Sequence, residues 1–229
     1  MKPAPLPCHP PDDATLAGQA VYSRRLLSWY DLIVLTVSNR WIWRCPTSRL
    51  LEWYDRHVSA EHLDVGVGTG YFLDHCRFPM AVPRITLLDL NPYCLEAAAS
   101  RIRRYAPATV QADVLQPLDL PGGPFESIAL NYLLHCLPGD LPRKSCVFDH
   151  LAAHLTPDGV LFGSTLLGQG VAPGWAARRL AAFYNRQRVF SNAQDRLDDL
   201  DRMLRARFAQ VQLEIQGCVA LFAARGFGQ

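Results

Sequence analysis

The feature that most constrains the fold is a glycine loop between a short apolar run and the start of a helix. Residues 63–72 read Leu-Asp-Val-Gly-Val-Gly-Thr-Gly-Tyr-Phe, with glycines Gly66, Gly68 and Gly70. Glycine has no Cβ atom, so the backbone turns tightly there and a ligand can lie directly against it. The dinucleotide fingerprint requires glycine where this chain has Tyr71, and the Lys-Ser/Thr pair of a phosphate loop is missing. The segment predicts a strand, a ligand-binding loop and a helix, and it disfavours phosphate binding.

A carboxylate follows the loop at an informative distance. The apolar run 84–89 ends in Asp89, about 20 residues beyond the loop, where an acidic side chain can accept hydrogen bonds from ribose hydroxyls. Alternatively, Asp89 caps the helix that opens at Asn91 and Pro92. Each signal alone is weak, but together at this spacing they favour a ligand that contains a ribose.

The rest of the chain alternates between short apolar runs and helical patterns. Strands followed by crossover helices predict a parallel sheet with helices on both faces. The last two strands are joined by a turn at Gln216 and Gly217, which predicts an antiparallel hairpin at one edge. The predicted strands are 62–65, 84–89, 109–112, 127–131, 160–165, 209–215 and 218–223, and the predicted helices are 71–76, 92–105, 141–155, 175–184 and 193–207. The acidic run from Asp195 to Asp201 predicts a solvated helix face rather than a cation site.

Three segments are expected along the chain. Residues 1–13 are rich in proline and predict a flexible tail. Residues 14–58 show helical spacing of apolar side chains and predict a helical lid. Residues 59–229 contain all the predicted strands and form the ligand-binding domain.

Composition excludes several function classes. The chain of 229 residues is 49% hydrophobic, enough for a full core. Lys and Arg total 23 against 21 Asp and Glu and are spread evenly, which argues against a nucleic-acid partner. The longest early apolar run, 32–35, is too short to span a bilayer. The seven cysteines have no metal or redox spacing, so we expect reduced thiols in a cytoplasmic protein. We expect this protein to be a monomer or a homodimer.

Five segments in order resemble the successive motifs of class I S-adenosylmethionine (SAM)-dependent methyltransferases: 63–72, 87–92, 111–114, 125–134 and 155–161. The resemblance covers the chain from about residue 62 to the end. It implies an α/β fold with a Rossmann-like, seven-stranded, mainly parallel sheet, a closing antiparallel hairpin and an N-terminal helical lid. SAM is the implied cofactor, and a ligand with a ribose and no phosphate agrees with the loop and with Asp89.

The resemblance also assigns cofactor-binding residues by position. Asp64 lies near the methionine part of SAM, and the loop glycines contact the adenosyl group. Asp89, with Leu90 beside it, holds the ribose, whereas Asp113 meets the adenine and Val114 flanks its ring.

Aromatic side chains crowd the predicted lid, and aromatic faces attract cations such as the SAM sulfonium. Trp43 is our candidate for cofactor contact, and Tyr30 is a candidate for the catalytic site. The alternative is that these rings only fix the helices to the core. The set comprises Trp29, Tyr30, Trp41, Trp43, Trp53 and Tyr54.

Further catalytic candidates follow the predicted strand 127–131. Asn131 can orient an amine or a carboxylate but cannot act as a base. His135 is a candidate general base, with a packed structural histidine as the alternative. Tyr184 is a candidate for the substrate wall, or else part of a helix end. The segment 131–139 lacks the Asn/Asp-Pro-Pro-aromatic motif of nucleobase and amide methylases and the carboxylate cluster of the metal-dependent type, so we expect no metal.

The leading hypothesis is a methyltransferase for a small, natural-product type of metabolite that works by in-line transfer. The chain also resembles the azetidine-2-carboxylate synthases of this fold, in which SAM is the sole substrate and methylthioadenosine leaves. A non-catalytic binding module is a third hypothesis, favoured if the lid aromatics form an exposed patch.

Overall fold

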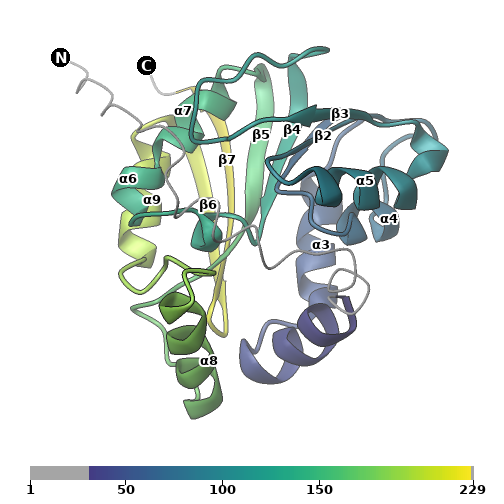
Figure 1. Ribbon diagram of the computed structural model, residues 1–229. Helices are drawn as coiled ribbons and strands as arrows, with labels where there is room; N and C mark the ends of the chain where they lie inside the picture. Colours follow the sequence, from purple (N-terminus) through teal and green to yellow (C-terminus); the bar gives the residue numbers. More distant parts are fainter. Residues whose placement is uncertain (1–30, 228–229) are drawn as a thin grey trace.

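A computed structural model describes residues 31–227 of the chain. Its centre is a seven-stranded sheet with the order β3-β2-β1-β4-β5-β7-β6 (Figure 1). Strands β1 to β5 pair in parallel, and β7 pairs antiparallel with both β5 and β6. The strands are β1 (Glu61–Val65), β2 (Arg84–Asp89), β3 (Ala108–Gln111), β4 (Phe125–Asn131), β5 (Leu155–Leu166), β6 (Phe208–Gln216) and β7 (Val219–Phe227). The predicted fold class is confirmed, with its parallel sheet and closing hairpin.

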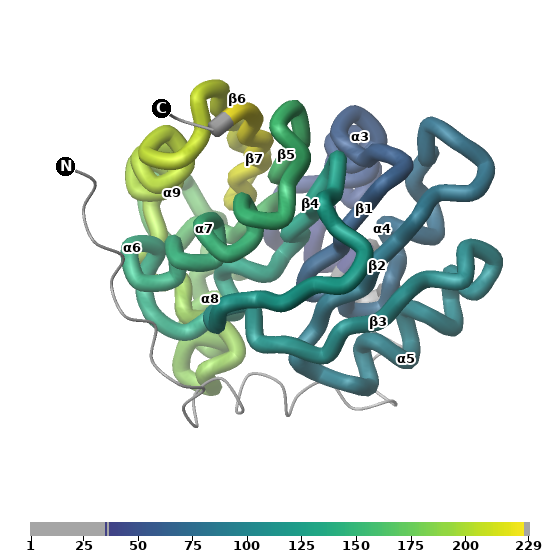
Figure 2. The backbone as a smooth tube through the Cα atoms, turned by 90° about the horizontal axis from the view of Figure 1, so that it is seen from above, coloured from purple at the N-terminus to yellow at the C-terminus, as the bar shows by residue number. Residues whose placement is uncertain are grey.

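Helices cover both faces of this sheet, as the view from above shows (Figure 2). Successive strand side chains point to opposite faces, so each central strand supplies both layers. In β4, Ala129 contributes to one hydrophobic core, and Ile128 and Leu130 contribute to the other. The first core includes α3 (Thr47–His57), α4 (Tyr71–His75) and α5 (Pro92–Arg101), and the second includes α6 (Leu141–Lys144), α7 (Cys146–Ala152) and α9 (Leu197–Arg205).

Two helices lie at one end of the sheet. The π-type helix η1 (Asp31–Ile42), in purple, and α8 (Trp175–Arg186), in green, both lie beyond the end at which β5 finishes (Figure 1). The main chain of Trp43 accepts a hydrogen bond from the amide of Cys218 at 2.9 Å, which ties the end of η1 to the hairpin. The short 3-10 helices η2 (Arg103–Tyr105) and η3 (Leu134–Cys136) complete the described chain.

Two predicted elements differ from the structure. The single helix predicted over 141–155 is two short helices, α6 and α7, and residue 155 already belongs to β5. The break follows Lys144, whose buried amine is bound by three oxygens. The solvated helix face predicted from Asp195 is wrong at that residue, because α9 begins two residues later and Asp195 is fully buried against Lys144.

Candidate active site

A cavity lies at the carboxyl ends of β1 to β4, where ligands of open α/β sheets bind. Its walls come from the loops that follow these four strands, together with Leu35 of η1. The structure brings together most of the residues that the sequence singled out: Asp64, Gly66, Gly68, Gly70, Asp89, Leu90, Asp113, Val114 and Asn131 all line this cavity. Residues as distant in sequence as Leu35 and Asn131 therefore meet in one place.

The three loop glycines have different surroundings, although all have positive φ angles. A Cβ atom on Gly70 would lie 2.9 Å from the Cα atom of Ala98 in α5, and one on Gly66 would lie 2.8 Å from a methyl carbon of Leu133. A Cβ atom on Gly68 would meet nothing within 4 Å. Gly66 and Gly70 thus permit close packing of the protein on itself, whereas Gly68 presents bare backbone to open space.

Asp89 is held by the loop that it faces. Its Oδ1 atom accepts a hydrogen bond from the amide of Asn91 at 2.8 Å. Burial raises the pKa of the Asp89 carboxyl to about 6, although the amide groups of Asn91, Gly68 and Val67 lower it. Asp89 therefore bonds to the start of α5, as a helix-capping residue would, and it also lines the cavity, as a ribose-binding residue would.

Two polar groups on the cavity wall have no partner within the described structure. One carboxylate oxygen of Asp113 accepts from the amide of Leu115 at 2.9 Å, and the other, Oδ2, is buried without a hydrogen bond. In Asn131, Oδ1 accepts from the hydroxyl of Ser164 at 3.0 Å, and the amide nitrogen has no partner. Buried polar groups are normally paired, so one free acceptor and one free donor in the lining of the same cavity indicate a polar ligand.

Tyr132 follows Asn131 and connects this wall to η1. Its φ angle of +55° is unusual for a residue with a side chain. Its hydroxyl donates to Oδ1 of Asn39 at 3.0 Å, and the Asn39 side chain in turn donates to Thr47 at 3.0 Å. Tyr132 lines the cavity, and η1 is thereby fastened to it.

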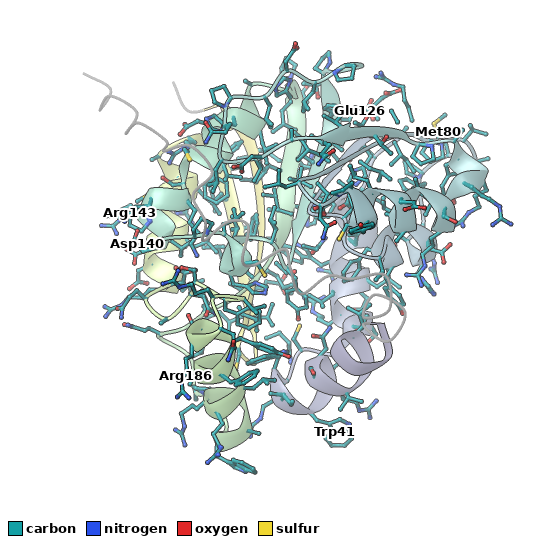
Figure 3. All side chains as sticks on the ribbon, in the orientation of Figure 1. Trp41, Met80, Glu126, Asp140, Arg143 and Arg186 are labelled. Carbon is teal, nitrogen blue, oxygen red and sulfur yellow. The ribbon has the colours of Figure 1, made fainter. Side chains whose placement is uncertain are left out.

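The remaining candidates lie elsewhere. Trp43 is 5% exposed in the core, 6.2 Å from the ring of Phe190, and does not line the cavity. Tyr184 contacts the same Phe190 ring at 4.8 Å, also away from the cavity. Trp41 is 71% exposed and projects away from the fold (Figure 3). Tyr30 and Trp29 lie outside the described residues.

His135 is buried beside the cavity wall but is not part of it. Its Nδ1 atom accepts a hydrogen bond from the amide of Leu166 at 3.3 Å, and its ring meets that of Phe190 edge-on at 4.7 Å. Burial, assisted by the Lys144 charge, lowers the pKa of His135 to about 3. These contacts agree with the structural alternative for this histidine, because the Nδ1 lone pair is already used.

The sequence interpretation overlooked aromatic residues that do line the cavity. Tyr71, Phe72 and Tyr132 contribute to its wall, unlike the four lid aromatics within the described residues. The signal was their position, since each directly follows the glycine loop or the end of β4. Among residues 31–227, no group of three His, Cys, Asp or Glu side chains is arranged to hold a metal ion, and no helix is long and apolar enough to cross a membrane.

Comparison with known proteins gives consistent matches over most of the chain. A family model described as a methyltransferase domain matches residues 63–161. The demethylluteothin O-methyltransferase of Streptomyces thioluteus is 40% identical over 213 residues, covering 93% of this chain and 93% of that protein. The physcion biosynthesis cluster O-methyltransferase of Aspergillus chevalieri is 38% identical over 212 residues, 92% of this chain and 95% of that protein.

A solved complex of DhpI with S-adenosylhomocysteine has the same fold, with a TM-score of 0.68 over 96% of this chain and 100% of that chain, at 14% identity. The chain therefore belongs to the class I SAM-dependent methyltransferase family. It is an enzyme with SAM as its cofactor, which confirms the family and cofactor predicted from the sequence motifs.

Proposed function

We propose that this enzyme transfers a methyl group from SAM to an oxygen atom of a small, natural-product type of metabolite. The observation that carries the proposal is the single cavity lined by Asp64, the glycine loop, Asp89, Asp113 and Asn131. The O-methyltransferase names of two relatives of similar length favour oxygen as the acceptor atom. The alternative, ring closure within SAM, gains no support from the names of these relatives.

The order of the strands supports one orientation of the cofactor. Asp113 follows β3 and Asp89 ends β2, so these two carboxylates suit the adenine amine and the ribose hydroxyls. Asp64 on β1 and Asn131 on β4 then lie at the methionine end. The free Oδ2 atom of Asp113 is an acceptor, as an amine requires. When bound, SAM supplies a methyl group on a positively charged sulfur.

Catalysis by these residues consists of positioning and exclusion of water. Well-oriented reactants can gain about 7–11 kcal/mol from proximity alone. The amide nitrogen of Asn131 is a free donor beside the methionine end and can hold an oxygen of the acceptor or of the cofactor. Tyr30, outside the described residues, is a proposed contributor to the acceptor side. Tyr184 could contribute there only indirectly, through its contact with Phe190, and His135 fixes the loop after β4.

We infer that η1, which is the part of the predicted lid 14–58 that lies before α3 within the described residues, covers the site as a lid. Two observations support this: Leu35 lines the cavity, and Asn39 accepts the hydrogen bond of Tyr132. Cofactor-dependent protection from hydrogen exchange in residues 31–43 is the expected result. Equal exchange with and without S-adenosylhomocysteine would contradict the lid.

We further propose a cytoplasmic enzyme that acts as a monomer or homodimer without nucleic acid. The buried thiols of Cys45, Cys76, Cys94 and Cys218 are free, in keeping with a reducing compartment. The near balance of 23 basic and 21 acidic residues favours a small-molecule partner.

The deciding experiment identifies the leaving product. The enzyme is incubated with SAM alone and with SAM plus a panel of phenols, enols and matched amines, and the products are separated by liquid chromatography and mass spectrometry. We expect S-adenosylhomocysteine only when a hydroxyl acceptor is present. Methylthioadenosine formed from SAM alone would support ring closure instead, and preference for the amines would contradict oxygen as the acceptor atom.

The cofactor site is tested separately by binding. Asp89→Ala removes two charge-assisted hydrogen bonds to the ribose and should weaken SAM binding by about 2–3 kcal/mol in calorimetry. Equal affinity of the variant and the parent protein would remove Asp89 from the site.

A further inference from the structure

A buried polar chain runs from the cavity into the core between the sheet and α3. In β1, His62 and Asp64 are two residues apart, so their side chains point to the same face of the sheet. Tyr54 of α3 lies over this face, and its hydroxyl is 2.6 Å from Oδ2 of Asp64 and 2.7 Å from Nε2 of His62. Ser127 is paired with His62 in the neighbouring strand β4 and lies 2.8 Å from Nδ1 of the same ring.

The Tyr54 hydroxyl donates its hydrogen bond to the carboxylate of Asp64. The Tyr54 oxygen can then accept from Nε2–H of His62, and the Ser127 hydroxyl lies within hydrogen-bond distance of Nδ1 of the same ring. The Ser127 oxygen accepts from the amide of Ser59 at 2.9 Å. Each polar side chain from Asp64 to Ser127 therefore has a hydrogen-bond partner in this buried chain.

The Tyr54 ring is held independently of its hydroxyl. It stacks on Phe72 with ring centres 5.7 Å apart, and it meets Phe162 edge-on at 5.2 Å. The side chain is fully buried. Burial, followed by the charge of Asp64, raises the pKa of the Tyr54 hydroxyl well above its ordinary range, so it remains a donor. Phe72 itself lines the cavity, whereas Tyr54 does not.

Asp64 is where this chain meets the cavity. With the nucleoside over β2 and β3, as in the proposed function on which this step rests, Asp64 faces the methionine end of the cofactor. That end carries an ammonium group, and a carboxylate is its natural partner. A carboxylate with free rotation would lose entropy on binding, and the Tyr54 hydrogen bond removes that freedom beforehand.

We propose that Tyr54 is a positioning residue for the cofactor, which holds Asp64 toward the cofactor's ammonium group and is itself directed by His62 and Ser127. Tyr54 does not touch the cofactor. Its effect should depend on whether the ligand carries the amino-acid end.

The experiment compares two ligands by calorimetry: S-adenosylhomocysteine, which has the amino-acid end, and methylthioadenosine, which lacks it. Tyr54→Phe keeps the ring contacts and removes only the hydroxyl. We expect it to weaken S-adenosylhomocysteine about tenfold, as loss of one charge-assisted interaction implies, and to change methylthioadenosine affinity less than about twofold. Tyr105→Phe is the matched control, because the Tyr105 ring contacts Phe78 in the same core and lies away from the cavity.

A second comparison tests whether Tyr54 acts through Asp64. Tyr54→Phe introduced into an Asp64→Asn background should have less than about a twofold further effect on S-adenosylhomocysteine. If Tyr54→Phe does not fold, Ser127→Ala takes its place, with a smaller loss of the same selectivity. Equal weakening of both ligands, or full additivity with Asp64→Asn, would overturn the inference. Failure of the parent protein to bind either ligand would overturn the proposed function, and the inference with it.

Discussion

Two buried polar networks lie on opposite faces of the sheet, and they differ in where they end. The network of Tyr54, His62 and Asp64, under α3, ends at the cavity. The network of Lys144 and Asp195, between α6 and α9, does not reach the cavity. The Lys144 amine donates to Asp195 at 2.7 Å, to the carbonyl of Ser191 at 2.8 Å and to that of Leu134 at 2.9 Å.

The difference separates two uses of buried polar groups. Lys144 joins η3, which follows the β4 loop, to the segment before α9, and every donor it has is consumed in doing so. Asp64 is fastened on one side and faces the cavity on the other. Burial and hydrogen bonding are common to both networks, so the contact of Asp64 with the cavity is the feature that distinguishes the first network from the second. The two networks should respond differently to mutation.

The largest effect on stability is expected from breaking the ion pair of Lys144 and Asp195. Lys144→Met leaves the Asp195 carboxylate buried without its cation, which should lower the free energy of unfolding by about 3–5 kcal/mol in urea denaturation. The double variant Lys144→Met, Asp195→Leu removes both charges and should recover most of this loss. A single variant as stable as the parent would show that Asp195 finds water or protonates, and that the network is not closed.

Two asparagines allow the same comparison between a side chain bonded within the protein and one at the cavity. Asn192 is 2% exposed and is fully engaged, with bonds to the Leu166 carbonyl and to Asn185, so Asn192→Ala should destabilise the protein by about 1–3 kcal/mol. Asn131 has a free amide nitrogen on the cavity wall, so Asn131→Ala should cost less stability and lower turnover more. Stability is measured by denaturation and turnover by product formation. A greater loss of stability in Asn131→Ala, or a greater loss of turnover in Asn192→Ala, would contradict this difference between the two asparagines.

Asp89, in the lining of the cavity, should make the stability of the protein depend on pH. Its pKa is about 6 in the folded protein because of burial, above the ordinary value of about 3.9. The folded state therefore holds the proton more tightly, and this group's contribution to stability is present below about pH 4 and is lost as the pH rises through 6. Asp89→Asn should raise the stability of the ligand-free protein at pH 7.5 by on the order of 1–2 kcal/mol while weakening SAM binding.

The parent enzyme should show the matching dependence in binding. Ribose hydroxyls donate to the ionised carboxylate, so SAM affinity should fall as the pH drops below 6. Calorimetry at pH 5, 6 and 7.5 measures this, and the Asp89→Asn variant should have a flat profile. A parent profile that is flat over the same range would argue that Asp89 stays ionised throughout.

The smallest effect is expected at the far end of the open network. Ser127→Ala removes the hydroxyl that lies 2.8 Å from Nδ1 of His62, and this hydroxyl is three hydrogen bonds away from Asp64. It should lower stability by about 1 kcal/mol and weaken S-adenosylhomocysteine only slightly. A loss of S-adenosylhomocysteine affinity larger than that caused by Tyr54→Phe would mean that the effect of a mutation does not decrease along the hydrogen-bond network with distance from the cavity.

The sequence predicted those parts of the molecule that local patterns encode. The glycine loop and Asp89 carry their chemistry within short segments, and both lie on the cavity as expected. The partners of Tyr54 and Lys144 were not predictable in this way, because the contacts join residues such as Lys144 and Asp195 that only the tertiary fold brings together. Lys144 did carry one signal, since apart from Lys2 every other cation in the chain is arginine.

The N-terminal aromatics within the described residues do not line the cavity, in contrast to the glycine loop and Asp89. Their clustering suggested a cage for a cation, but Trp43 and Trp53 lie in the core, and Trp53 donates to the carbonyl of Phe222 at 3.1 Å. Apolar area buried by such large rings outweighs any single ligand contact. Composition in one segment therefore reports how strongly a helix is attached to the sheet, not which ring faces a ligand.

The unequal surroundings of the loop glycines bear on how such an enzyme can diverge. A side chain at Gly66 or Gly70 would meet the protein's own atoms, so substitution there is expected to strain the fold itself. Gly68 has open space beside it, and a side chain there costs only the backbone strain of its positive φ angle, about 1–2 kcal/mol. A lineage that gave up the cofactor could therefore change Gly68 first and still inherit the scaffold.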